Sequence, residues 1–262
     1  MDAHIGQAPP LLKNYLLHPS GGLRWHWRAL RYRKRWQPFV QAVHTWIYAW
    51  TEALPRSLNA LILVGPSAGW SLPLAAFKRF EQVVIFEPDA VARALLGARM
   101  RPVRAYSVRL HYDHHDLFAA GGLQYLHATY PTAAILFCNV LGQLNLIVPE
   151  HSSTAAAVCK GIASTLQDRH WASYHDLIST TTPPQTGLAP CSTAHGVYFP
   201  TRTPLEQVLI RFWTQSEIEL YDHETNSLGN ADPFQCALWQ ITPARWHLVQ
   251  WVSHLPASPA PR

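Results

Sequence analysis

Apolar and polar positions in the middle of the chain alternate between short strand-like runs and longer helix-like segments. Runs typical of strands cover residues 61–64, 82–86, 108–115 and 133–137, and segments 71–80 and 90–99 between them suit short helices. The first run is apolar at every position, as expected for a strand buried on both faces. Strands that alternate with helices in this way predict a parallel sheet with helices on both faces.

The second half of the chain predicts further elements of the same architecture. A helix-like segment at 154–167 precedes a fifth strand at 171–179, WASYHDLIS. After a long Thr- and Pro-rich segment, 180–203, come a short helix at 204–212 and strand-like segments at 216–222, 236–240 and 246–252. We expect these last segments to form two or three antiparallel strands. A loop as long as 180–203 is often functional or mobile.

A glycine-containing turn follows the first strand and favours a ligand site. Gly65 and Gly69 lack side chains that would keep a ligand away from the backbone, although a turn with no ligand uses the same residues. The second strand ends in Glu87-Pro88-Asp89. In a doubly wound sheet an acid at that position faces the ligand crevice, where its carboxylate can accept both hydroxyl groups of a ribose.

The third and fourth strands also end in polar or small residues, Asp116-Leu117-Phe118 and 138–142, CNVLG. With the glycine turn and the acid at Glu87, this order of motifs resembles the class I S-adenosylmethionine (SAM)-dependent methyltransferases over residues 58–254. The resemblance implies a Rossmann-like, seven-stranded, mostly parallel α/β sheet whose last strand is antiparallel. It also implies SAM as the cofactor and transfer of a methyl group as the activity.

The resemblance assigns cofactor contacts to particular positions of this chain. The glycine turn would hold the methionine part of SAM, Glu87 the ribose, and Asp116 the adenine amino group. The full set of implied cofactor residues is Gly65, Pro66, Ser67 and Gly69 in the turn, Glu87 and Pro88, then His115, Asp116 and Leu117 around the base, and Cys138, Asn139 and Val140 beside the methyl group.

Two positions depart from the family's usual acid-x-G-x-G-x-G turn. Leu63 stands where an acid commonly helps to hold the amino group of the cofactor, and Ser67 replaces the middle glycine. A catalytically silent protein that kept the fold for binding or as a scaffold is therefore an alternative. A nicotinamide-dependent oxidoreductase is disfavoured, because Ser67 and Trp70 occupy the glycine positions of G-x-G-x-x-G.

Candidate catalytic residues follow the core of the fifth strand, at Tyr174, His175 and Asp176. A histidine with a pKa near neutrality can take a proton from an acceptor, and Asp176 could orient it; a structural role for His175 is the alternative. Methyl transfer mainly needs in-line placement of the acceptor, so a missing base would not exclude it. We expect residues 184–199 to contribute specificity. A small-molecule acceptor is favoured, with RNA as the alternative.

Positive charge is concentrated at the N-terminus. Residues 1–58 hold eight Lys or Arg and two acids, a net charge of +6, whereas the rest of the chain has thirteen basic and fourteen acidic residues, a net charge of −1. The segment that begins at Arg24 and ends at Trp36, RWHWRALRYRKRW, alternates aromatic and cationic residues. This pattern suits nucleic acid, an anionic lipid surface, or an amphipathic helix whose tryptophans pack onto the domain.

A second helix is predicted at 37–54, with Pro38 in its first turn and Pro55 after its end. We expect residues 1–58 to form a lid or an acceptor-recognition element on the domain at 59–254, with a flexible tail at 255–262. A role in packing alone is the alternative for the N-terminal segment.

No metal site is expected from the sequence. In the run at 111–116, HYDHHD, strand alternation sends neighbouring side chains to opposite faces, so His114 and His115 do not serve one ion together. The four cysteines, at 138, 159, 191 and 236, have no paired spacing and indicate free thiols in a reducing compartment, with the cytoplasm as the default. No signal peptide is evident, and no apolar run reaches the roughly 20 residues that span a bilayer.

Overall fold

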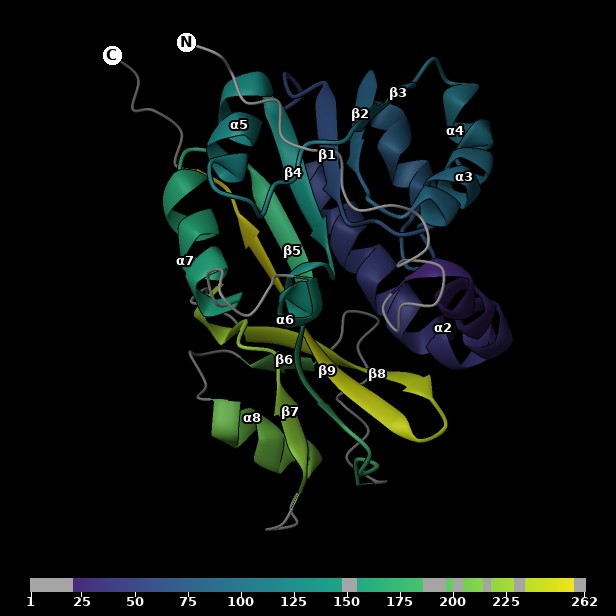
Figure 1. Ribbon diagram of the computed structural model, residues 1–262, viewed down its shortest axis with the longest axis vertical. Helices are drawn as coiled ribbons and strands as arrows, with labels where there is room; N and C mark the ends of the chain where they lie inside the picture. Colours follow the sequence, from purple (N-terminus) through teal and green to yellow (C-terminus); the bar gives the residue numbers. More distant parts are fainter. Residues whose placement is uncertain are drawn as a thin grey trace.

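The computed structural model describes residues 21–147, 155–185, 197–199, 205–213, 218–228 and 234–256 (Figure 1). Some segments with expectations from the sequence lie outside these ranges: the first 20 residues, most of the 180–203 segment, residues 216 and 217, and the tail after residue 256.

A single sheet forms the centre of the molecule (Figure 1). Its parallel part has the strand order β3-β2-β1-β4-β5. The bounds are β1 (Ala60–Val64), β2 (Gln82–Phe86), β3 (Arg109–Asp113), β4 (Ala133–Cys138) and β5 (Trp171–Thr180). The order reverses between β1 and β4, and in open α/β sheets ligands bind beside the carboxyl ends of strands at such a point.

The C-terminal hairpin completes the sheet. β9 (Arg245–His254) lies beside β5 and runs antiparallel to it, and β8 (Phe234–Thr242) pairs antiparallel with β9. These two strands and the five parallel ones confirm the predicted doubly wound, mostly parallel α/β architecture with an antiparallel last strand. Two strands of three residues, β6 (Val197–Phe199) on β8 and β7 (Leu220–Asp222) on β5, bring the described sheet to nine strands.

Helices cover both faces of the sheet, because alternate side chains of the buried strands point to opposite faces. In β1, Leu61 and Leu63 join one apolar cluster, whereas Ile62 and Val64 join the other. The first face carries α2 (Gly22–Ala53), η1 (Leu74–Arg79), α3 (Ala90–Arg99) and α4 (Arg101–Arg104). The second carries α5 (Gly122–Thr129), η2 (Leu141–Gln143), α6 (Leu144–Ile147) and α7 (Ala155–Thr165).

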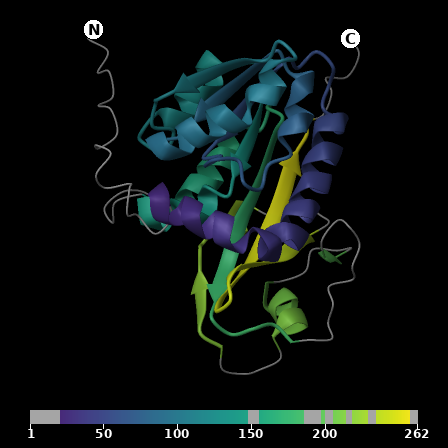
Figure 2. The same cartoon turned by 90° about the vertical axis from the view of Figure 1, so that its right-hand side faces the viewer.

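The N-terminal helix α2 is one element of 32 residues, so the prediction of two helices with Pro38 in the first turn of the second is wrong. Pro38 lies inside the helix. It has no N–H to donate to the carbonyl four residues earlier, and its ring crowds that carbonyl, which bends a helix instead of ending it when both halves are packed. Figure 2 shows the bend between the two halves of α2.

Apolar packing explains why both halves of α2 persist. In the second half, the Phe39 ring stacks on Trp239 of β8 at 4.6 Å, and Trp46 lies 5.9 Å from Trp251 of β9. The Trp36 indole N–H donates to the carbonyl of Ile241 at 3.0 Å. These contacts hold the helix across the hairpin and direct its first half toward the carboxyl ends of β1 and β2.

Two local predictions differ from the structure. The segment expected as a helix at 71–80 is the 3-10 helix η1, which begins only after Pro73. The segment expected at 216–222 contributes the short strand β7, which pairs with β5 and not with the C-terminal hairpin. Helix α5, which had no counterpart in the sequence analysis, follows Gly121.

The outer part of β5 and the hairpin extend beyond the parallel sheet and form a separate small core. Leu177, Ile178 and Leu248 pack there against Val208 and Phe212 of α8 (Leu205–Phe212). The 3-10 helix η3 (Asn226–Leu228) lies against α7, where Ser227 Oγ contacts the carbonyl of Ala156 at 3.5 Å. This extension places the chain after β7 beside the end of β4.

Candidate functional site

The glycine turn after β1 lies against the segment after β4. Gly65 has a φ of 62°, and a Cβ there would lie 2.5 Å from the Cβ of Val140. Its N–H donates to the carbonyl of Phe86 at 2.8 Å, which fixes the turn to the end of β2. Ser67 and Gly69 also have positive φ values, 51° and 69°. The backbone of the turn thus borders the crevice at close range, and only glycine fits at Gly65.

Glu87 at the end of β2 holds this turn. One carboxylate oxygen accepts the Ser67 N–H at 2.7 Å and the other accepts the Asp89 N–H at 3.0 Å. Burial raises the pKa of Glu87 to about 7, against the opposing effect of these two backbone donors. A carboxylate has about four lone-pair sites, so two remain for the hydroxyl groups of a ligand.

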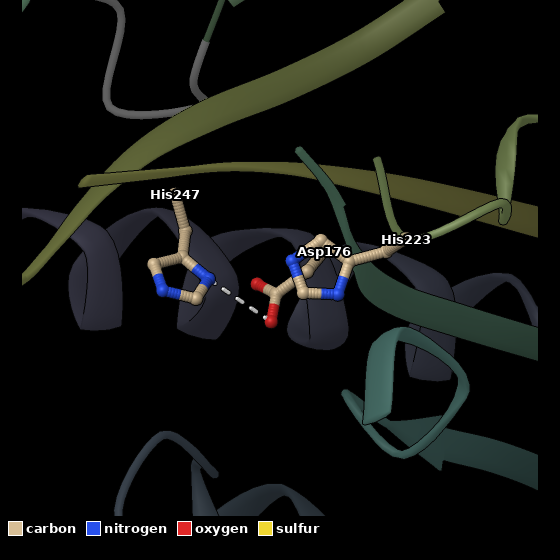
Figure 3. A group of neighbouring side chains, drawn as sticks. All are labelled: Asp176, His223 and His247. Atoms are coloured by element: carbon tan, nitrogen blue, oxygen red, sulfur yellow. Dashed lines mark ion pairs between the residues drawn. The ribbon is translucent and has the colours of Figure 1, made fainter. Parts of the chain in front are cut away.

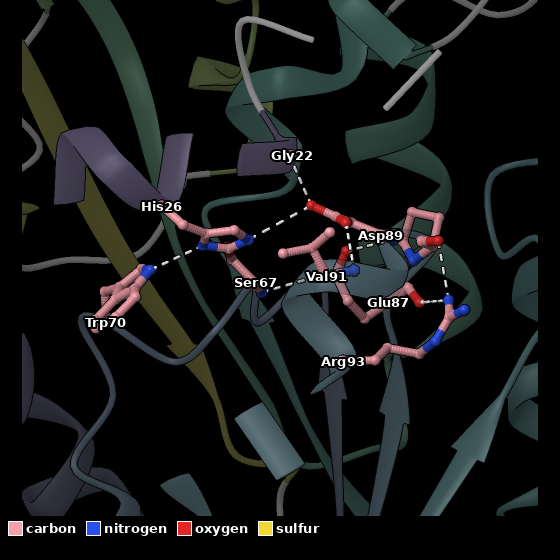
Figure 4. A network of polar contacts seen from close by, with 9 residues as sticks. Gly22, His26, Ser67, Trp70, Glu87, Asp89, Val91 and Arg93 are labelled. Atoms are coloured by element: carbon pink, nitrogen blue, oxygen red, sulfur yellow. Dashed lines mark hydrogen bonds and ion pairs between the residues drawn. The ribbon is translucent and has the colours of Figure 1, made fainter. Parts of the chain in front are cut away.

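The first turn of α2 closes over this end of the crevice (Figure 4). Asp89 caps α3 by accepting the Val91 N–H at 2.8 Å, and its second oxygen accepts the Gly22 N–H at 2.7 Å. The same oxygen lies 3.5 Å from His26 Nε2, while the Trp70 indole N–H donates to His26 Nδ1 at 3.0 Å. Because Nδ1 accepts, the proton of a neutral His26 is on Nε2 and faces Asp89.

Hydrogen bonding outweighs burial at Asp89. Burial raises the pKa of this carboxyl. The His26 side chain and the backbone N–H groups of Gly22 and Val91 lower it by more than burial raises it, so that the net pKa is below its usual value. Asp89 is therefore ionised at neutral pH, and it ties the start of α2 to the strand end that carries Glu87.

Two aspartates at the end of β3 and just after it have different environments. Asp113 accepts the Tyr125 and Tyr130 hydroxyls at 2.8 and 2.7 Å, which makes it a structural anchor for α5. Asp116 is exposed and one of its oxygens accepts the Phe118 N–H at 2.9 Å. The His115 ring stacks on Tyr125 at 3.8 Å. Leu117 beside them is buried. Asp116 thus keeps a solvent-facing carboxylate, as expected for a group that meets a ligand.

The segment after β4 joins the glycine turn to β5. Asn139 has a φ of 58°, and its side chain makes a two-way contact with Asp176: Oδ1 accepts the Asp176 N–H at 2.8 Å and Nδ2 donates to Oδ2 at 3.2 Å. Gln143 Nε2 donates to the same oxygen at 2.9 Å. Val140, the next residue in the chain, lies against Gly65, so one short segment connects the glycine turn with Asp176.

The three catalytic candidates on β5 do not face the same way. Tyr174 lies on the α2 face, where its hydroxyl is 2.8 Å from Ser71 Oγ, and burial raises its pKa well above the usual value. His175, on the opposite face, pairs through Nδ1 with Ser173 Oγ at 2.9 Å. Burial lowers the pKa of His175 to about 4. The structure therefore does not bring His175 and Asp176 together as an acid–base pair.

Asp176 instead meets two histidines that the sequence analysis missed. His247 Nδ1 of β9 lies 3.1 Å from Asp176 Oδ2, and one ring nitrogen of His223, after β7, completes a group whose ligand atoms all lie within 4.8 Å of one another (Figure 3). Burial raises the pKa of Asp176, but His247, His223 and Asn139 together outweigh burial, so that the net pKa is below its usual value. Burial lowers the pKa of His223. No local motif signals this group, because its members come from three separate segments.

The cysteines that the structure describes offer no activated thiolate. Cys138, Cys159 and Cys236 are free and buried. Burial raises the pKa of each, so these thiols stay protonated and unreactive at neutral pH.

The basic segment of α2 divides its aromatic residues between core and solvent. Trp36 is buried, and its ring lies 5.5 Å from Trp25 and 4.9 Å from Trp239. Trp27 is 60% exposed, with the Arg31 guanidinium 5.1 Å from the centre of its ring. Part of the segment is therefore an amphipathic helix packed onto the domain, and part is a cationic, aromatic surface.

A small cavity lies between α2 and the residue after the glycine turn. Its volume is about 280 Å³. The lining residues are Ala29, Arg33, Lys34, Trp36, Gln37, Val40 and Trp70. Trp70 directly follows Gly69, so this cavity lies next to the glycine turn, and Arg33 and Lys34 give it two cationic side chains.

Comparisons with known proteins find relatives only among solved structures. No family model and no curated protein sequence matches the chain. The structures found include the magnesium protoporphyrin IX methyltransferase of Synechocystis PCC 6803 with bound SAH, at 16% identity and a TM-score of 0.47, over 92% of this chain and 97% of that chain.

Other matches are more distant. A SAM-dependent methyltransferase from Aquifex aeolicus is 8% identical, with a TM-score of 0.31, over 74% of this chain and 82% of that one. An O-methyltransferase family protein from Burkholderia thailandensis is 12% identical, with a TM-score of 0.31, over 79% and 55%. The strand order and register of the chain itself define the architecture.

No helix within the described ranges is both long enough and apolar enough to cross a membrane.

Proposed function

We propose that the chain binds SAM at the carboxyl ends of β1, β2 and β4 and transfers its methyl group to an acceptor. The observation that carries the proposal is the fixed pairing of the glycine turn with the acid of the next strand: the Ser67 N–H donates to Glu87 at 2.7 Å while Gly65 brings the backbone to the crevice. This arrangement lets a ligand approach the backbone of the turn closely and leaves lone pairs of the carboxylate for the hydroxyl groups of a ribose.

The remaining strand ends supply roles for the other parts of the cofactor. Asp116 has a solvent-facing oxygen for the adenine amino group, with His115 beside it on Tyr125. Asn139 and Val140 lie between the glycine turn and Asp176, which is where the transferable methyl group would meet an acceptor. Gly65, Pro66, Ser67, Gly69, Glu87, Pro88, Leu117 and Cys138 complete the proposed cofactor set.

We favour a small acceptor, and the cavity of about 280 Å³ beside Trp70 supports this choice. Pockets for small molecules measure about 300–1,000 Å³, and this cavity is slightly smaller than that range. Tyr174 and Asp176 face the same side of the sheet as α2, whereas His175 is neutral, buried and directed away. We therefore assign in-line placement of the acceptor, and not proton abstraction by His175, as the main contribution of this chain.

A second candidate, a protein that binds SAM or its demethylated product without catalysis, is favoured by Leu63. This side chain is fully buried in the apolar core on the α2 face. It therefore cannot supply the carboxylate that commonly holds the cofactor's amino group. The two candidates differ in turnover and not in cofactor binding.

Calorimetric titration with SAM, S-adenosylhomocysteine and NADH tests the proposal. We expect saturable binding of both sulfur ligands and none of NADH. Glu87→Ala should weaken SAM binding about tenfold or more, because lost hydrogen bonds to a charged group cost about 1.5–3 kcal/mol. Glu81→Ala is the matched control, since Glu81 is an exposed acid one strand length away.

Absence of binding by either sulfur ligand contradicts both candidates, and tight NADH binding contradicts the assignment of the turn. If SAM binds, transfer of labelled methyl groups to a panel of small hydroxyl, amine and ring acceptors distinguishes the enzyme from the silent binding protein.

A further inference from the structure

The group formed by Asp176, His223 and His247 is almost completely withdrawn from solvent. The exposed fractions of the three residues are 0%, 5% and 7%. Buried polar atoms normally have hydrogen-bond partners. Among the described residues, none donates to or accepts from Asp176 Oδ1, His223 Nε2 or His247 Nδ1 with hydrogen-bond geometry. Three buried atoms without a hydrogen bond, one of them in an ion pair, lie at one place and call for a common explanation.

The tautomer of His223 is fixed by its one partner. Nδ1 lies 2.5 Å from the carbonyl oxygen of Gly142. A carbonyl only accepts, so Nδ1 carries the proton and Nε2 of the neutral ring presents a lone pair. Metal-binding histidines commonly donate their other N–H to a backbone carbonyl in this way. Burial lowers the pKa of this ring, in keeping with a neutral imidazole.

The other two members place candidate ligand atoms next to each other. His247 Nδ1 and Asp176 Oδ2 are 3.1 Å apart, within ion-pair distance. Asn139 and Gln143 donate to Oδ2 and hold the carboxylate in place, as outer groups do around a ligating carboxylate. Figure 3 shows the two rings on either side of the carboxyl group.

The fold builds this arrangement through an irregularity in β5. The register with β9 shifts between Asp176 and Ile178, which leaves Leu177 bulged. The freed Leu177 carbonyl accepts the His223 N–H at 2.9 Å, and the Asp176 carbonyl accepts the Thr225 hydroxyl at 2.7 Å. β-Bulges often re-aim side chains next to functional sites. The segment that carries His223 is thus bonded directly to the strand that carries Asp176.

We propose that Asp176, His223 and His247 form a site for one divalent transition-metal ion, of the zinc or ferrous-iron class. Two imidazoles and one carboxylate are the donors these ions prefer, and three protein ligands leave at least one coordination position open. Bonds of about 2.0–2.2 Å place neighbouring donors about 3.0–3.5 Å apart, close to the separation of His247 and Asp176. The ion draws the third donor, His223, inward by on the order of 1 Å.

Metal content of the whole chain is the first measurement. Tag-free protein is freed of metal with a chelator and equilibrated with Zn²⁺, and separately with Fe²⁺ without oxygen. Elemental analysis after removal of free metal should then give one ion per chain. Titration with Co²⁺ should produce visible absorption that saturates at one ion per chain. A wild-type protein with neither a stoichiometric ion nor a saturable Co²⁺ band overturns the proposal, whatever any variant does.

Three substitutions locate the ion. His223→Ala, His247→Ala and Asp176→Asn should each weaken binding at least about tenfold. The matched control is the double variant His111→Ala/His114→Ala, because these exposed histidines belong to the other histidine- and aspartate-rich run of the chain. It should keep one ion per chain. Retention of the ion by all three cluster variants, or its loss from the control alone, contradicts the assignment.

Thermal unfolding covers the case in which a cluster variant folds poorly. A ligand that binds only the folded chain raises the unfolding temperature as its concentration rises. Zn²⁺ should raise it for the wild type and for the control but not for Asp176→Asn. No rise for the wild type shows that the buried group is a paired carboxylate and imidazole without metal. None of these measurements uses SAM or an acceptor, so their failure is separate from failure of the proposed methyl transfer.

Discussion

The crevice has two ends that the chain builds in different ways. At the cofactor end, Gly65, Ser67, Glu87 and Asp89 come from one strand–turn–strand unit, and the critical contacts are made by backbone N–H groups. At the Asp176 end, the contacts join side chains of β5, of the turn after β7 and of β9. The first end depends on local turn geometry and the second on the register of distant strands. Substitutions should therefore damage them by different physical routes.

The largest effect is expected at Gly65. A Cβ there overlaps the Cβ of Val140, at 2.5 Å, and a φ of 62° is strained for any other residue. Gly65→Ala should lower the free energy of unfolding by about 3 kcal/mol or more, from strain and overpacking together. Urea denaturation measures this loss. Adding Val140→Ala should recover part of it, and an unchanged midpoint in the single variant contradicts the close approach of the two loops.

Protonation of Glu87 should give an effect of similar size that depends on pH. Its pKa is about 7 in the folded chain and 4.5 in the unfolded one, so the folded state holds the proton more tightly. The contribution of Glu87 protonation to the free energy of unfolding is complete below pH 4.5. It is lost as the pH rises to about 7, and the loss amounts to up to about 3 kcal/mol.

Glu87→Gln removes this titration from the cofactor end. The stability of the wild type relative to the variant should fall between pH 4.5 and 7, as measured by denaturant unfolding across that range. Parallel curves for the two proteins rule out the raised pKa.

A substitution at Gly142 tests the close packing at the Asp176 end, as the substitution at Gly65 tests it at the glycine turn. A Cβ at Gly142 would lie 2.7 Å from both the Cβ and the backbone N of Asp176. Gly142→Ala should cost about 2 kcal/mol by overpacking and should reduce the metal content. Gly161→Ala in α7 is the control, because a Cβ there would meet only the Leu123 side chain of α5, at 3.6 Å. It should stabilise the chain by about 0.5–1 kcal/mol. Equal effects at both glycines contradict the tight contact at Asp176.

A smaller effect is expected at the contact between Asp89 and the start of α2. Asp89→Ala removes the cap of α3 and the acceptor of the Gly22 N–H, for about 1–2 kcal/mol. Hydrogen exchange should speed up in the first turns of α2 and remain slow in its second half. Asp116→Ala, which removes an exposed acceptor, should change neither.

The smallest effect on stability is expected on the exposed cationic surface of α2. Arg31, Arg33 and Arg35 are exposed, and their joint substitution by Ala should change the free energy of unfolding by less than about 0.5 kcal/mol. The same variant tests the RNA alternative. RNA binding that weakens with salt and disappears in the variant supports an RNA acceptor, and salt-insensitive or absent binding excludes it.

The difference between the two ends also explains what could be predicted from sequence. The strands β1, β2 and β4 and the residues at their ends follow from apolar runs and a glycine turn, which are local signals. Asp176 was recognised for its place on β5, but its partners were not. His223 and His247 lie 47 and 71 residues further along, and only the pairing of β9 and the turn after β7 brings them near.

The N-terminal helix shows the opposite kind of error. The sequence predicts Pro38 in the first turn of a helix, where proline is common. Stacking of Phe39 on Trp239 and the bond from Trp36 to Ile241 hold the helix on both sides of the proline. Such tertiary contacts override a local stop signal, and they come from strands about 200 residues away in the chain.

The bulge at Leu177 has a consequence for how β5 can vary. Before it, Ala172 and Tyr174 face α2, so even-numbered positions point to that side. Beyond it, Ser179 pairs with His247 and the odd-numbered positions take over. The alternation of the two faces along the strand therefore shifts by one position at Leu177. Because Asp176 pairs with Val249 and Ile178 with the neighbouring Leu248, deleting Leu177 would leave the rest of the strand facing the same way. It would remove only the bulge and, with it, the carbonyl that accepts the His223 N–H, so β5 can lose this residue without turning over but not without releasing His223.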